Sequence, residues 1–148
     1  MHAVAEEIRV VVARVTPLLA QMSADEVAAK PQPEKWSKKE VLGHLIDSAA
    51  NNHQRFVRAG YKAALEFPAY AQNDWVRVQG HQEADWPLLV ELWSAYNRHL
   101  CGVLERLPAE AFSELCNFGK DGPVPLEVVV KGYLTHLRHH VVQLVGEV

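Results

Sequence analysis

The chain has 148 residues, of which 49% are hydrophobic and 22% are charged, and its formal net charge is -3. This length suits one domain, spanning residues 1–148, with a core large enough to fold without disulfides or a structural metal. No apolar run is long enough to cross a bilayer, the basic residues form no stripe, and the N-terminus shows no export signal. We therefore expect a cytoplasmic protein that binds neither membranes nor nucleic acid.

The first predicted helix runs from about residue 3 to residue 21, where apolar side chains recur at helical spacing. Pro17 lies inside this run, and a proline removes a backbone hydrogen bond from a helix. We therefore expect a kink there, or an end to the first part near Thr16. The next segment, Ser23-Ala-Asp-Glu26, has a capping-box pattern that predicts one short additional helical turn.

The second long helix has the clearest start signal in the chain, the capping box Ser37-Lys-Lys-Glu40, and is expected to reach about Ala59. Besides an apolar stripe for the core, it carries a polar stripe at three- and four-residue steps, consisting of His44, Asp47, Ser48, Asn51 and Arg55. This stripe is either a solvated face or the wall of a polar cavity. Since it lacks Lys and Glu, which dominate solvated faces, the composition favours a cavity.

Residues 60–84 form a long mixed stretch, which we expect to be an irregular loop that packs across the bundle. Its aromatic residues Tyr70 and Trp75 are expected to pack onto the helices. Asp85-Trp-Pro87 then supplies a cap and an early proline for a third helix that ends near residue 107. Two prolines introduce the fourth helix, expected over residues 126–146.

His136 and His140 lie four residues apart in the fourth helix. Residues at this spacing share one helix face, with Cβ atoms about 6 Å apart, so two imidazoles can reach one cation. With His44 as a third ligand, the site would hold a borderline divalent ion and keep a coordination position open, as catalytic sites do. Gly132, one turn earlier on the same face, leaves space beside the histidines.

A simpler explanation is that amphipathic helices often place polar residues four apart. The other histidines are expected to have no role in the site; His139 is expected to lie at the surface or behind the ligands, and the rest are His2, His53, His81 and His99. The chain also lacks the HExxH pattern of zincins and the Glu-x-x-His pairs of di-iron bundles. If a metal site exists, it is therefore mononuclear. The two cysteines, Cys101 and Cys116, lack CxxC spacing, and we expect both to be reduced and buried.

Several motifs together resemble the DinB/YfiT-like superfamily, over nearly the whole chain. They are Trp36-Ser37 at a helix start, Gly43-His-Leu-Ile-Asp-Ser48, Asn73-Asp-Trp75 and His136-Leu-Arg-His-His140. The resemblance implies an all-α four-helix bundle with up-down-down-up topology, usually dimeric, that binds zinc or nickel through three histidines. Those ligands fall on His44, His136 and His140. The YfiT-like branch, which is the closest, is described as metal-dependent hydrolases related to bacillithiol-transferase-like proteins.

The expected function is metal-dependent enzymatic action on a small-molecule substrate. In thiol transfer, a low-molecular-weight thiol attacks an electrophile, while Arg55 and Asn51 hold an anionic group of the thiol. In hydrolysis, Asp47 or a water that it orients is the base, although Asp47 could equally orient His44. We favour thiol transfer, because the metal itself creates the nucleophile and no carboxylate adjoins the histidine pair. A metal-dependent hydrolase and a non-catalytic metal-binding or sensing bundle are the alternatives.

Overall fold

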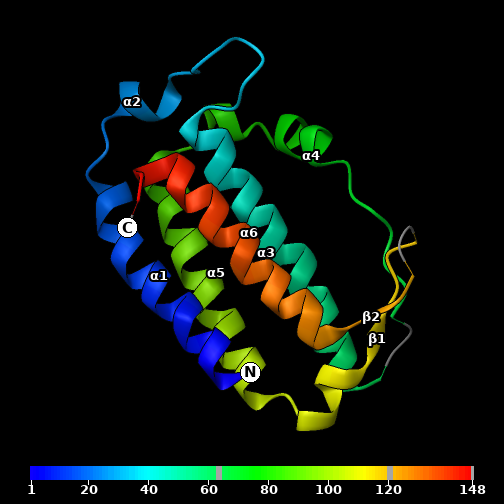
Figure 1. Ribbon diagram of the computed structural model, residues 1–148. Coiled ribbons are helices and arrows are strands. Elements are labelled where there is room, and N and C mark those ends of the chain that lie inside the picture. Colours follow the sequence, from blue (N-terminus) through cyan, green and yellow to red (C-terminus); the bar gives the residue numbers. More distant parts are fainter. Residues whose placement is uncertain (63–64, 120–121, 148) are drawn as a thin grey trace.

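Four long helices form a bundle in the computed structural model, which describes residues 1–62, 65–119 and 122–147 (Figure 1). The long helices are α1 (His2–Ala20), α3 (Lys38–Gly60), α5 (Trp86–Arg106) and α6 (Leu126–Val145). Each begins and ends close to its predicted boundary, so the expected all-α bundle is confirmed. In the part of the chain that is described, no helix is long and apolar enough to cross a membrane.

The topology is up-down-down-up, as expected. α1 packs against α5 and α6, and α3 packs against the same two helices. Arg9 near the start of α1 forms an ion pair with Glu105 near the end of α5, so these two helices are antiparallel. Ser37 at the start of α3 bonds Gln82, just before α5 begins, so α3 and α5 run parallel. Because consecutive parallel helices lie side by side, the chain must return along the bundle between them.

The returning segment contains more regular structure than predicted. The expectation of an irregular loop over residues 60–84 is wrong in part, since it includes helix α4 (Gln72–Gln79) and the 3-10 turn η1 (His81–Glu83); residues 63–64 lie outside the described part. Gly80 caps the C-terminal end of α4, and its φ of 65° lies in the left-handed region, which glycine adopts readily. Both elements pack against α3. This agrees with the prediction that the segment packs across the bundle.

Of the two alternatives expected at Pro17, an end of the helix near Thr16 is wrong, because α1 continues through Pro17 to Ala20. Pro17 lies in the last turn, where its missing N–H removes only one intrahelical hydrogen bond. The short turn after α1 is confirmed as α2 (Ala24–Ala28), and its cap Ser23 accepts a hydrogen bond from the Glu26 N–H.

α3 lies at the centre of the molecule, since α4, α5, α6 and η1 all pack against it. Its predicted capping box is confirmed, because Ser37 Oγ accepts from the Glu40 N–H while the Glu40 carboxylate accepts from the Ser37 N–H. Every residue from Glu40 to Ala49 is buried. Polar side chains on this stretch are therefore enclosed by the neighbouring elements.

A small hairpin precedes α6 after the 3-10 turn η2 (Ala109–Ser113). It pairs β1 (Leu115–Cys116) with β2 (Val124–Pro125) in antiparallel fashion. The bridge between Glu66 and Asn117 attaches the crossover segment to this end of the molecule. Cys101 and Cys116 are buried free thiols, as expected.

Candidate metal centre

Three imidazoles gather where α3 faces the second half of α6. One ring nitrogen from each of His44, His136 and His140 lies within 4.8 Å of the other two. The Nε2 atoms of His44 and His136 are 3.0 Å apart, and the ring centroids of the three histidines are 4.6 to 5.0 Å apart. The structure thus brings together the three residues that spacing and family resemblance selected.

Hydrogen bonds at the outer ring nitrogens orient two of the imidazoles. His140 Nδ1–H donates to Gln143 Oε1 at 2.8 Å, because an amide oxygen can only accept. Ser48 Oγ lies 3.4 Å from His136 Nδ1 and can accept its proton. In these tautomers the Nε2 atoms of both rings keep free lone pairs, as metal-ligating histidines require.

Burial keeps these imidazoles neutral. Burial, followed by the nearby rings of His136 and His140, lowers the pKa of His44 to about 4. Burial and the ring of His140 likewise lower the pKa of His136 to about 4, and burial lowers the pKa of His140. The histidines are therefore unprotonated at neutral pH and need not lose a proton to bind a cation.

This donor set fits a borderline divalent ion. Three neutral imidazoles converge, and no carboxylate or thiolate joins them among the described residues. Two neutral nitrogens 3.0 Å apart, His44 Nε2 and His136 Nε2, can either share one proton or share one cation. The other nitrogen of the fully buried His44 ring, Nδ1, has no hydrogen-bond partner among the residues that the structure describes. Three protein ligands leave further coordination positions for a substrate.

Asp47 is tied to the crossover segment rather than to the histidines. It is 2% exposed, it accepts a hydrogen bond from Gln79 Nε2 at 2.7 Å, and its carboxylate lies 3.3 Å from His81 Nε2. His81, expected to have no role, is buried and packs directly against Gly43. His81 lies outside the three-histidine cluster, and its contact with Asp47 was not predicted; Gly43, one turn before Asp47, was the sequence signal for this close approach.

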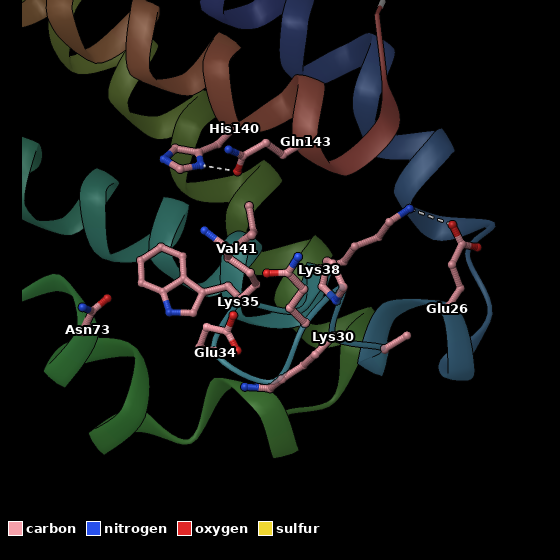
Figure 2. Close-up of a pocket in the computed structure, with 13 residues that line it drawn as sticks. Glu26, Lys30, Glu34, Lys35, Lys38, Val41, Asn73, His140 and Gln143 are labelled. Atoms are coloured by element: carbon pink, nitrogen blue, oxygen red, sulfur yellow. Dashed lines mark hydrogen bonds and ion pairs between the residues drawn. The ribbon is translucent and has the colours of Figure 1, made fainter.

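A cavity of about 800 Å³ opens beside His140 (Figure 2). His140 and Gln143 of α6 form one side of it, and Asn73 of α4 lies opposite. Its remaining walls come largely from the segment around the start of α3, namely Lys30, Lys35, Trp36, Lys38 and Val41. The Trp36 ring also lies 5.0 Å from the His44 ring, so this cavity adjoins the histidines closely.

A second cavity of about 430 Å³ is lined by His136. α3 contributes three polar side chains to its wall, Ser48, Asn52 and Arg55. Asn51, expected to hold a cofactor, donates to the backbone of Asp47 and is not among the lining residues. The neighbouring residue Asn52 lines the cavity instead. The expectation that the polar stripe of α3 lines a cavity is thus met by two of its members, Ser48 and Arg55.

The two loop aromatics pack against each other, with ring centroids 5.2 Å apart. Tyr70 lines the second cavity, whereas Trp75 is 39% exposed and lines neither cavity described above. A further pair, His53 and His99, lies on the neighbouring faces of α3 and α5 with ring centroids 5.1 Å apart, and His53 bonds the Tyr96 hydroxyl. Sequence spacing could not reveal this contact, since it joins residues of different helices.

The comparisons with known proteins agree with this architecture. The family model of the DinB superfamily matches residues 7–144. Several proteins of Bacillus cereus named "Putative metal-dependent hydrolase" are 27% identical over 105 residues, which cover 71% of this chain. The matched region spans only 60% of the length of these relatives.

Two solved structures share the fold. YfiT from Bacillus subtilis, described as a probable metal-dependent hydrolase with an unusual four-helix bundle topology, superposes with a TM-score of 0.82 at 20% identity. The match covers 96% of this chain and 82% of YfiT. The mycothiol-dependent maleylpyruvate isomerase superposes with a TM-score of 0.78 at 14% identity, covering 96% of this chain and 59% of the isomerase.

Proposed function

Since the chain belongs to the DinB superfamily, we propose that it is a metal-dependent enzyme whose divalent ion is bound by His44, His136 and His140. The observation that carries this proposal is the convergence of three neutral imidazoles between two cavities. The names of the Bacillus cereus relatives support metal dependence. Zinc and nickel are the proposed ions, because imidazole nitrogen suits both.

For the reaction, we propose transfer of a low-molecular-weight thiol to an electrophilic small molecule. When bound, the divalent ion supplies a Lewis acid that lowers the pKa of a coordinated thiol or water. Two cavities adjoin the histidines, so two reactants can reach one centre from different sides. The fold shared with a mycothiol-dependent isomerase is compatible with a thiol as one reactant.

The chain's own residues would bind and orient the reactants. Gln143 and Ser48 hold the imidazole tautomers, and Arg55 supplies a fixed positive charge for an anionic group. Asp47 orients the crossover segment through Gln79 and His81 rather than facing either cavity.

Hydrolysis is the second candidate, favoured by the names of the relatives. It requires a base for water, but Asp47 is buried and already accepts hydrogen bonds, and no acidic residue lines the cavity beside His136 in the described part of the chain. Two carboxylates, Glu26 and Glu34, line the cavity beside His140, but Glu26 is paired with Lys38 and neither belongs to the group of side chains that could hold the ion. For this reason we rank hydrolysis below thiol transfer. A non-catalytic sensing bundle would bind the metal without turning over either kind of substrate.

Metal content per chain tests the site. The tag-free protein, loaded with zinc or nickel and dialysed, is expected to hold about one equivalent by mass spectrometry, since the described part of the chain contains one three-ligand cluster. His136→Ala and His140→Ala should each abolish this equivalent. His139→Ala is the matched control, because His139 is exposed on the same helix and outside the cluster. Full occupancy in either ligand variant would contradict the site.

Reaction class is then tested on the loaded protein. Consumption of a low-molecular-weight thiol with an aryl halide, compared with release of nitrophenol from nitrophenyl esters, separates transfer from hydrolysis. Thiol consumption that depends on His140 supports the proposed reaction, and ester cleavage alone supports the hydrolase. If neither occurs while metal is bound, the sensing bundle is favoured.

We also propose that the chain forms a homodimer through α1 and α6. Val10 of α1 is 47% exposed and Val142 of α6 is 50% exposed, and both line one groove between the two helices. Val142→Glu should shift sedimentation from dimer to monomer. A wild-type protein that sediments as a monomer would contradict the proposal.

A further inference from the structure

The guanidinium of Arg55 has no acidic partner among the described residues, since none of the ion pairs there involves it. One of its five N–H donors is used, by the bond from Nη1 to Asn52 Oδ1 at 3.1 Å. The group is nevertheless half-buried, and burial lowers its pKa. A partly desolvated cation that pairs with none of the described carboxylates is stabilised by an anion that enters the same cavity.

Two aromatic rings hold this guanidinium in place. Its central carbon lies 4.4 Å from the centroid of Phe118 and 5.8 Å from that of Phe67. Such stacking leaves the edge of the guanidinium, with its N–H donors, available for a planar or tetrahedral oxyanion. Arg58, one turn further along α3, also lies over Phe67, at 5.4 Å, but does not line the cavity.

A chain of side chains connects Arg55 to the metal centre along one face of α3. Arg55 donates to Asn52, Asn52 Nδ2 lies 3.4 Å from Ser48 Oγ, and Ser48 faces His136 Nδ1. Ser48 and Arg55 are separated by roughly 10 Å along the helix axis at 1.5 Å per residue. An ion of the size of acetate cannot reach both ends of this path, so a ligand that does so needs a body of several atoms.

The opposite wall, on α6, has no acidic or basic side chain other than the neutral imidazole of His136, and it has free space beside Gly132. Val128 and Val129 line it, and a Cβ added at Gly132 would meet no heavy atom within 4 Å. No acidic side chain is among the lining residues in the described part of the chain. The cavity therefore combines one cationic end with an uncharged flank.

We infer that this cavity, which we name the Arg55 cavity, binds a small molecule with a carboxylate or phosphate head on Arg55 and an apolar body along Gly132 toward His136. This inference deepens the proposed function and rests on it for what happens at the His136 end. It assigns Arg55 to an anionic group of the electrophilic reactant, rather than to the thiol as expected from the sequence, and leaves the larger cavity beside His140 to the thiol.

Calorimetric titration of the zinc-loaded protein with hexanoate, hexanamide, acetate and butyl phosphate tests the inference. Hexanoate or butyl phosphate should bind, and the tighter of the two identifies the head group. Hexanamide, which lacks the charge, and acetate, which lacks the body, should bind at least about tenfold more weakly, as the loss of one charge-assisted contact or of a few buried methylenes predicts. Equal binding of hexanoate and hexanamide, or no binding of either anion, would overturn the inference without any variant.

Variants then locate the site. Arg55→Gln should weaken the binding of hexanoate at least about tenfold. The matched control Arg58→Gln should leave the affinity for hexanoate within about twofold of the wild-type value. Gly132→Leu should also weaken the binding of hexanoate, because the leucine side chain fills the free space beside residue 132 without changing any charge. If Arg55→Gln does not fold, Arg55→Lys, which retains the positive charge, replaces it as the test variant. Equal effects of the substitutions at Arg55 and Arg58 would place the anion elsewhere.

Metal content measured on the same samples separates the two proposals. If hexanoate binds through Arg55 but the protein holds no metal, the metal-dependent function fails and the anion site stands. If metal is bound but hexanoate binding is insensitive to Arg55, the anion site alone fails.

Discussion

Two helical glycines near the histidines have opposite surroundings. A Cβ added to Gly43 would lie 2.2 Å from Cγ of the buried His81, whereas a Cβ at Gly132 would meet nothing within 4 Å. Gly43→Ala must therefore displace His81 and should lower the free energy of unfolding by about 1–3 kcal/mol. Gly132→Ala should instead raise it by about 0.5–1 kcal/mol, since alanine favours the helix. Denaturant unfolding measures both, and a neutral Gly43→Ala would contradict the packing of His81 on α3.

Gln143 is exposed, yet it fixes the ring of His140 through the bond to Nδ1. Gln143→Met removes this acceptor at similar size. We expect zinc affinity to fall about 10- to 100-fold, as is usual when a ligand loses the hydrogen bond that orients it. Competition with a chromophoric chelator measures the affinity. His139→Ala, which removes the other contact of Gln143 at 3.3 Å and an edge contact with the His140 ring but leaves the bond to Nδ1, should have a much smaller effect.

At the scale of the element, the start of α3 depends on the charge of Glu40. Burial alone would raise the pKa of Glu40, but the hydrogen bonds from Lys30 and from the Ser37 N–H outweigh it and lower the pKa. Glu40 therefore stabilises the fold above its unfolded pKa, and this contribution is lost as the pH falls through the lower folded pKa.

Glu40→Gln should lower the free energy of unfolding by about 0.5–1 kcal/mol at neutral pH, because it removes the ion pair with Lys30 and the negative charge at the start of the helix. The difference from wild type should shrink on acidification and vanish at low pH, where both side chains are uncharged. Unfolding measured across a pH series checks this expectation. Glu34→Gln, at an exposed carboxylate just upstream that forms no ion pair among the described residues, is the control for removal of a charge near the helix start.

At the scale of the whole molecule, the proposed metal site joins α3 to α6, which are remote in the sequence. A ligand that binds only the folded state stabilises it, by about 2.7 kcal/mol at a concentration 100 times Kd. Zinc should therefore raise the unfolding midpoint of the wild type, and chelation should reverse the change. His44→Ala should remove this response while retaining the bundle. A shift of equal size in His44→Ala would show that zinc acts elsewhere.

Much of this molecule was predictable from local patterns. The capping box at Ser37 and Glu40, the cap and proline before α5 and the apolar periodicity of α6 fix the long helices, because their signals lie within one or two turns. The spacing of His136 and His140 likewise fixes their shared face. The helix end predicted near Thr16 was wrong, because α1 runs for one more turn, through Pro17 to Ala20.

Contacts between remote elements were decided only by tertiary structure. Parallel packing of α3 and α5 requires the returning segment, and that segment brings Gln79 and His81 onto Asp47. The surrounding elements bury His44, Asp47 and Ser48 of the polar stripe, whereas Asn52 rather than Asn51 lines the cavity beside His136. Sequence patterns report which residues share a face of one helix, whereas burial and partners depend on which other element covers that face.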